Sequence, residues 1–158
     1  MSKIDYKSAG VDIDAGNRVV EQIKDSVKST FSKNVLTGLG SFGSLYDLKP
    51  LFKKYENPVL VQSIDGVGTK TIIARKLKKF DTIGIDLLSA CANDILVMGA
   101  KPITFLDYIA NEKLRPDIVE KIVSGMVKAC RETNVSLVGG ETEDTFVSLQ
   151  ALTIPETI

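Results

Sequence analysis

The chain has 158 residues, of which 44% are hydrophobic and 25% charged, an ordinary composition for a globular protein with one core. Its 20 basic and 20 acidic residues cancel, so bulk charge indicates neither a nucleic-acid nor a membrane partner. The chain contains no histidine, which excludes histidine as its general base or metal ligand. Because the sequence has two cysteines, no apolar leader and no membrane-length apolar run, we expect reduced thiols in a cytoplasmic protein.

Helical and strand patterns alternate along the chain. A helix that opens at Asp14 is predicted from the apolar face Val20, Ile23, Val27 and Phe31. After it come a glycine-rich turn at 38–43, a strand at 59–64, a loop at 65–70 and a short basic helix up to residue 79. The remaining predicted elements are an almost wholly apolar helix at 84–98, a strand at 103–109, a helix from Pro116 to Asn134, and a strand at 135–138. This alternation predicts one α/β (or α+β) domain with helices covering a sheet.

The turn at 38–43 has the spacing G-x-G-x-x-G, and Asp65 lies downstream where a ribose-binding acid would be. A dinucleotide-binding fingerprint follows a strand and opens a helix, whereas a helix and a polar turn precede this one. We therefore set the dinucleotide interpretation aside. The glycines give either a plain flexible turn or backbone amides that approach an anion closely.

The segment DGVGTK, from Asp65 to Lys70, is more informative. A predicted strand ends at Asp65, Gly66 and Gly68 free the backbone, and Thr69 and Lys70 stand where a helix begins. Amides, a helix start and a lysine together form a phosphate cradle, and the neighbouring carboxylate suits magnesium. The alternative is an ordinary turn with a solvated lysine.

Two further acids follow apolar segments. Asn93 and Asp94 lie within the most apolar helix, where an unpaired carboxylate is costly to bury, so Asp94 either pairs locally or faces a cation. Glu141 follows two glycines after the last strand. We expect Asp65, Asp94 and Glu141 to share one magnesium ion with phosphate oxygens. Asp107 is a weaker candidate, structural or substrate-facing.

Six segments then form a recognisable set: YKSAGVDIDAGN (6–17), GLGSFG (38–43), DGVGTK (65–70), DTIGIDL (81–87), ND (93–94) and LVGGET (137–142). In this order they closely resemble the phosphoribosylformylglycinamidine cyclo-ligases, also called aminoimidazole ribonucleotide synthetases. The resemblance implies an ATP- and Mg²⁺-dependent ring closure of formylglycinamidine ribonucleotide, in which the formyl amide oxygen is phosphorylated. It also implies a homodimer in which the two sheets form a barrel-like interface.

The resemblance assigns roles to individual residues. Magnesium and ATP phosphates would be held by Asp65, Asp94 and Glu141. The nucleotide loop would be lined by Gly66, Gly68, Thr69 and Lys70. The catalytic residues would be Lys24, which contacts phosphate, and Asp94. The substrate side of the cleft would include Gly38, Gly40, Ser41 and Gly43.

The family pattern is lost after Thr142. Residues 1–142 are predicted to form the ATP-binding amino-terminal domain, and residues 143–158 an atypical tail in place of the family's carboxy-terminal domain. An altered reading frame is one hypothesis for this tail. Two alternatives stay open: an inactive remnant that dimerises and binds nucleotide, or another ATP-using member of the superfamily, such as selenophosphate synthetase. The opening segment 6–17 argues against the latter.

Overall fold

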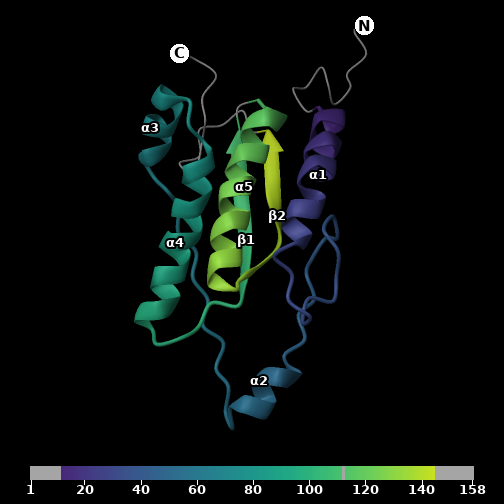
Figure 1. Cartoon of the computed structure of the whole chain (residues 1–158), viewed down its shortest axis with the longest axis vertical. Coiled ribbons are helices and arrows are strands. Elements are labelled where there is room, and N and C mark those ends of the chain that lie inside the picture. Colours follow the sequence, from purple (N-terminus) through teal and green to yellow (C-terminus); the bar gives the residue numbers. More distant parts are fainter. Residues whose placement is uncertain (1–11, 112, 145–158) are drawn as a thin grey trace, which may run out of the picture.

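A computed structural model describes residues 12–111 and 113–144 of the chain (Figure 1). The helices are α1 (Ile13–Lys28), α2 (Lys49–Lys54), α3 (Lys70–Leu77), α4 (Asp81–Val97) and α5 (Pro116–Thr133), and the strands are β1 (Thr104–Asn111) and β2 (Ser136–Asp144). The predicted mixed α/β architecture is confirmed, with a small parallel sheet. No helix in this described part of the chain has the length and apolarity needed to cross a membrane.

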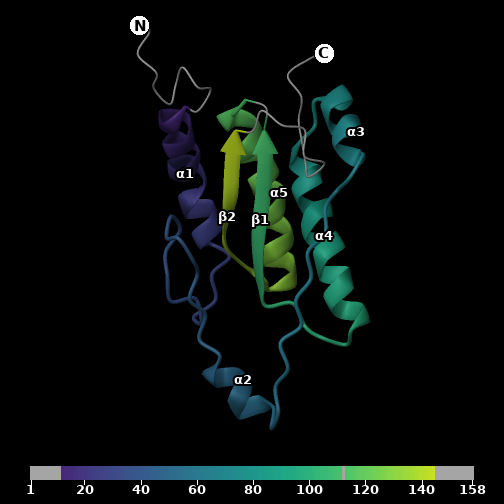
Figure 2. The same cartoon turned by 180° about the vertical axis from the view of Figure 1, so that it is seen from behind.

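The sheet consists of β1 and β2, which pair in parallel because the chain crosses over through α5. Helix α5 covers one face of the sheet, and none of the described helices lies over the opposite face (Figure 2). The prediction that the last strand ends at residue 138 is wrong. Strand β2 continues through the Gly-Gly-Glu-Thr motif to Asp144, since β1 offers it partners as far as Asn111.

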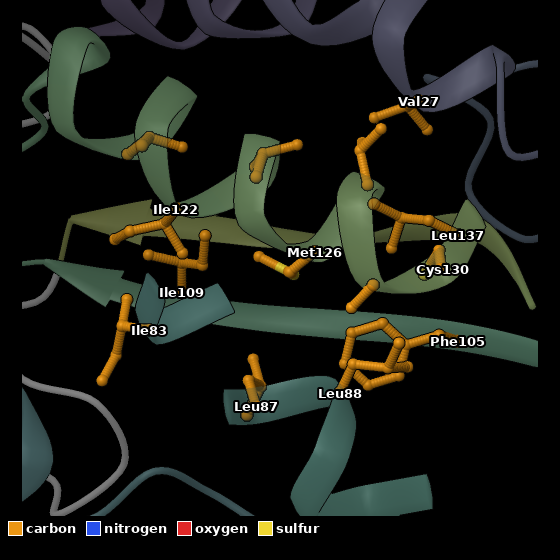
Figure 3. Packing of buried hydrophobic residues seen from close by; sticks show 14 of the residues in the cluster. Val27, Ile83, Leu87, Leu88, Phe105, Ile109, Ile122, Met126, Cys130 and Leu137 are labelled. Atoms are coloured by element: carbon orange, nitrogen blue, oxygen red, sulfur yellow. The ribbon is translucent and has the colours of Figure 1, made fainter. Parts of the chain in front are cut away.

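Helix α5 lies at the centre of the core. Pro116 occupies its first turn and Asn134, in the left-handed conformation with φ 56°, ends it, as predicted. Its predicted apolar face is buried throughout: Val119, Ile122, Val123, Met126, Val127 and Cys130. This face contacts side chains of the sheet and of α4, among them Phe105, Ile109 and Leu87 (Figure 3). Helix α1 packs against the other side of α5 and against β2.

Two glycines bring α4 and α5 into backbone contact. A side chain added at Gly84 would collide with the carbonyl oxygen of Ile122, and one added at Gly125 would collide with that of Asp81. No rotamer change relieves a collision with backbone. The close crossing of α4 and α5 therefore depends on both glycines.

Helix α4 is less enclosed than its composition predicts. Its buried residues are Ile83, Gly84, Leu87 and Leu88, all in the first half. In the second half Val97 is 82% exposed and Met98, the residue that caps the helix, is 70% exposed. The expectation of burial on most sides is wrong because, among the described helices and strands, α5 covers one side of α4 and α3 adds a small contact.

The segment 59–64 is extended but is not a strand. It runs between β1 and α4 in both views of the fold (Figures 1 and 2) without entering the sheet. Val59 is 84% exposed and Ile64 is 94% exposed. The strand prediction fails here because β-branched residues favour extended backbone, whereas a strand also needs a hydrogen-bonded partner.

Helix α1 begins earlier than predicted. The Asp12 carboxylate accepts a hydrogen bond from the Ala15 amide at 3.0 Å and so caps the helix two residues before Asp14. The buried face is Ala15, Val19 and Val27. Of the predicted face, Val27 is buried, and Ile23 and Phe31 pack partly buried against the core, Phe31 from beyond the end of the helix. Only Val20, which is 41% exposed, was wrong, and Val19 is buried in its place.

Candidate functional site

The loop between the extended segment and α3 has the form of an anion cradle. Val67 is buried and anchors it, while Gly68 adopts the left-handed conformation with φ 56°, which glycine accepts without strain. Asp65 is exposed, and one of its carboxylate oxygens accepts the Gly66 amide at 2.7 Å. In the described part of the chain, no hydrogen bond involves the amides of Gly68 and Thr69. These two amides are therefore available to a phosphate.

Asp65 and Asp94 lie around the same cysteine. The Cys91 thiol donates a hydrogen bond to the backbone carbonyl of Asp65 at 3.6 Å, and the Ser63 hydroxyl donates one to Asp94 Oδ2 at 2.7 Å. Partial burial, followed by the negative charges of Asp65 and Asp94, raises the pKa of the Cys91 thiol. Both carboxylates are thus near one point on α4.

Asp94 is not buried in the structure. Asn93 and Asp94 are both exposed, so the predicted cost of a buried carboxylate is absent. The apolar part of α4 around them is also accessible to solvent on this side, which the composition of the helix did not indicate. What Asp94 offers is an exposed carboxylate with one oxygen held by Ser63.

Lys70, at the first turn of α3, forms an ion pair with Asp86 of α4 at 2.8 Å. The two side chains are 59% and 33% exposed. An ion pair in such contact with water contributes little to stability, about 0–1 kcal/mol. Lys70 can therefore exchange this partner for a phosphate at small cost.

Glu141 lies on β2, opposite Tyr108 of β1. The Tyr108 hydroxyl donates a hydrogen bond to Glu143; this bond, ahead of the charge of Glu141, raises the pKa of Tyr108. Across residues 12–111 and 113–144, no three acidic or thiol side chains are close enough together to hold one metal ion. The structure thus brings Asp65 and Asp94 together but does not gather Glu141 with them.

Asp107, on β1, has a strongly raised pKa. Burial, followed by the charge of Glu141, raises its pKa from 3.8 to about 7. Its charge in turn acts on Cys130 of α5, whose pKa burial raises to about 12. An Asp107 oxygen occupies the space where a side chain at Gly140 would begin, so the second glycine of the Gly-Gly-Glu motif accommodates this carboxyl.

The remaining predicted site residues lie elsewhere. Lys24 is on α1, where it pairs with Glu21 at 3.7 Å, and α1 and α4 are on opposite sides of α5 (Figure 1). Gly38, Gly40, Ser41 and Gly43 belong to an exposed loop. This loop is closed by an antiparallel bridge between Val35 and Tyr46. The structure brings neither group next to Asp65 and Asp94.

A cavity of about 400 Å³ lies at the start of α1, where it meets the end of β2. Asn17 contributes to its wall from the opening motif and Thr142 from the closing one. The motifs 6–17 and 137–142 are more than a hundred residues apart, and sequence reasoning did not predict that they meet. The only signal in the sequence for this contact was that both motifs belong to the same family pattern.

The chain belongs to the family of AIR synthase related proteins: the model of their N-terminal domain matches residues 51–155. It is 52% identical over 139 residues to a phosphoribosylformylglycinamidine cyclo-ligase of Brevibacillus brevis, covering 88% of this chain and 40% of that protein. It is 53% identical over 144 residues to the cyclo-ligase of Carboxydothermus hydrogenoformans, covering 91% and 41%. A trifunctional purine biosynthetic protein of Chironomus tentans is 50% identical over 143 residues, covering 90% and 10%. The chain thus spans about two fifths of the length of these cyclo-ligases.

Proposed function

We propose that this chain is the nucleotide-binding part of a phosphoribosylformylglycinamidine cyclo-ligase and acts in purine biosynthesis. The observation that carries the proposal is the 52% identity to a named cyclo-ligase across 88% of the chain. The meeting of Asp65 and Asp94 beside Cys91 supports it, because these acids come from two motifs of the family pattern. Since the relatives are longer, the complete reaction is part of the proposal.

The proposed reaction closes an imidazole ring at the expense of ATP. The formyl amide oxygen of formylglycinamidine ribonucleotide takes the γ-phosphoryl group, which leaves ADP. The amidine nitrogen then bonds to the formyl carbon, the carbon–oxygen bond breaks, and phosphate leaves. Phosphorylation makes the oxygen a good leaving group, and the attack gains because both groups belong to one molecule.

The residues of the cradle suit a magnesium nucleotide. Magnesium usually takes one or two carboxylates together with phosphate oxygens and water, which fits the pair Asp65 and Asp94. When bound, it would offset the negative charge on the transferred phosphoryl group. The free amides of Gly68 and Thr69 would bind phosphate oxygens, and Lys70 would add a positive charge after leaving Asp86.

Several assignments remain predictions within this proposal. They are Glu141 as a third magnesium ligand, Gly66 as part of the nucleotide loop, Lys24 as a catalytic phosphate contact, and Gly38, Gly40, Ser41 and Gly43 on the substrate side. The boundary at residue 142 and the atypical tail are likewise predictions. Residues 145–158 lie outside the described part of the chain.

We also propose a homodimer in which the uncovered face of the sheet meets its counterpart in a barrel-like interface. On this face Leu106 is 62% exposed and Tyr108 is 42% exposed. Apolar side chains of this size, side by side on an uncovered sheet, favour association. Sedimentation of the wild type and of Leu106→Lys tests the proposal, which requires that the variant be the more monomeric of the two.

The second candidate function is nucleotide binding without turnover. It is favoured by the separation of Lys24 and Glu141 from the pair Asp65 and Asp94. Phosphate release that depends on formylglycinamidine ribonucleotide distinguishes the two. Release with this substrate supports the cyclo-ligase, release with a different acceptor supports another member of the superfamily, and binding without release supports the second candidate.

The binding step is tested by thermal unfolding with and without Mg-ATP. A ligand at a hundred times its Kd stabilises the native state by about 2.7 kcal/mol, so the midpoint of the wild type should rise. Asp65→Asn and Asp94→Asn should each remove most of this rise. Asp25→Asn, an exposed acid on α1, is the matched control and should retain it. Equal rises in all four proteins would refute a role for the two acids.

A further inference from the structure

The extended segment before the cradle is attached to the fold mainly by side chains. In the described part of the chain, residues 59–64 make no backbone hydrogen bond to another segment. The buried side chain of Val67 holds one end of the loop. The two hydrogen bonds from Cys91 to Asp65 and from Ser63 to Asp94 join the segment to α4.

These two bonds run in opposite directions between the same two elements. In one, Cys91 of α4 donates to the backbone of Asp65, the residue that follows the segment; in the other, Ser63 of the segment donates to Asp94 of α4. Together they fix Asp65 relative to Asp94. The bond from Ser63 uses only Oδ2 of Asp94, so Oδ1 stays available to a cation.

The chemistry of Cys91 suits a donor rather than a nucleophile. An ordinary cysteine thiol has a pKa of about 8.5 and so keeps its proton at neutral pH, and this thiol donates to the Asp65 carbonyl at 3.6 Å. A protonated thiol can hold a carbonyl oxygen without adding a third negative charge beside Asp65 and Asp94. A serine at this position would offer the same donor with a shorter reach.

We propose that Cys91 and Ser63 are positioning residues, which set the distance between Asp65 and Asp94 and thereby the affinity of the chain for a magnesium nucleotide. This inference rests on the proposed function, in which the two acids hold the magnesium ion. It adds two residues that touch neither the metal nor the phosphates. Each acts through the acid that it holds.

The first test measures Mg-ATP binding by calorimetry. One hydrogen bond contributes about 0.5–1.5 kcal/mol, so Cys91→Ala and Ser63→Ala should each weaken binding by roughly 2–12-fold. Cys91→Ser should recover part of the loss, because its hydroxyl can still donate. Ser89→Ala is the matched control, since this exposed serine of α4 donates only to Ile85 of its own helix, at 2.8 Å. The unfolding midpoints of these proteins without ligand should stay close to that of the wild type.

The second test does not depend on nucleotide. The sequence has two cysteines, and Cys130 has no exposed surface, so iodoacetamide should react with the native protein at Cys91. If Ser63 holds the segment over the thiol, Ser63→Ala should speed alkylation of Cys91 by several-fold, and Ser89→Ala should leave it unchanged. An unchanged rate in Ser63→Ala would overturn the inference.

The two tests separate this inference from the proposed function. If Asp65→Asn and Asp94→Asn abolish Mg-ATP binding while Cys91→Ala and Ser63→Ala do not weaken it, the acids bind the nucleotide but the positioning role is wrong. If the wild type does not bind Mg-ATP, the proposed function fails and so does the consequence for affinity. The alkylation rate still decides whether Ser63 fixes the segment over Cys91.

Discussion

Replacing a helical glycine with alanine is expected to destabilise the fold at two positions and to stabilise it at a third. In Gly125→Ala, the new methyl group would overlap the carbonyl oxygen of Asp81 and lie 3.0 Å from the carbonyl carbon, well inside the roughly 3.5–4.0 Å at which carbon atoms rest. Both atoms are backbone, so α4 and α5 must separate by on the order of 1 Å. Gly84→Ala meets the carbonyl oxygen of Ile122 in the same way. In α1, by contrast, nothing lies within 4 Å of a methyl group added at Gly16.

The magnitudes follow from two opposing effects. Alanine stabilises a helix interior by about 0.8–1.0 kcal/mol relative to glycine, and this gain applies to all three sites. Overpacking costs about 1–3 kcal/mol, and more where backbone must move, and it applies only at the crossing of α4 and α5. Because backbone must move, we take the upper end of this cost and expect Gly125→Ala and Gly84→Ala to lose about 2 kcal/mol of unfolding free energy. Gly16→Ala should gain about 0.5–1 kcal/mol.

Urea unfolding followed by circular dichroism, at one fixed protein concentration, measures these differences. For a chain of this size, 1 kcal/mol corresponds to a midpoint shift of about 2–4 °C in thermal unfolding, which gives a second measurement. The reasoning is refuted if Gly125→Ala is as stable as the wild type. It is also refuted if Gly16→Ala and Gly125→Ala shift the midpoint in the same direction by similar amounts.

Three further predictions concern single residues. Asp107 has a pKa of about 7 in the folded chain and about 3.8 when unfolded, so the folded state binds an extra proton between these values and stability should fall as pH rises from about 4 to 7. At about 1.4 kcal/mol per pKa unit the fall is on the order of 4 kcal/mol, and Asp107→Asn should flatten it in urea unfolding at a series of pH values. The buried Ser136 hydroxyl accepts the Ser32 amide at 3.0 Å and donates to the Thr30 carbonyl at 3.1 Å, so Ser136→Ala should cost about 1–3 kcal/mol in urea unfolding, whereas no loss would mean that water replaces both bonds. Lys78 ends α3 with φ 50°, a conformation that costs a non-glycine residue about 1 kcal/mol; Lys78→Gly should raise the thermal midpoint, and a lower midpoint would contradict the strain.

Much of the fold could be predicted from local signals. Pro116 and Asn134 mark the two ends of α5 by their backbone preferences, and the apolar spacing between them gave its buried face. The segment 59–64 has equally clear strand residues, yet it is unpaired, because pairing depends on which neighbours reach it. Similarly, the composition of α4 indicated burial, but only the arrangement of other elements decides how many of its sides are covered.

Part of the candidate site could likewise be predicted from the sequence, and part of it could not. The loop at 65–70 could be predicted because glycines, an acid and a lysine have clear backbone and charge preferences. That Asp65 meets Asp94 follows from two side-chain hydrogen bonds across 26 and 31 residues, for which the sequence carries no local signal. We expected Glu141 at the end of a strand. Strand β2 instead continues past Glu141, and the position of this residue is set by its pairing with Tyr108 of β1.

The central position of α5 has a consequence for synthesis. Helices α1 and α4 both pack on α5, which follows them in the chain and ends at Thr133. A ribosome therefore releases two helices with apolar sides before it releases the surface that covers them. Until then their apolar sides face water or a chaperone, and a pause in translation between residues 97 and 133 would prolong this exposure.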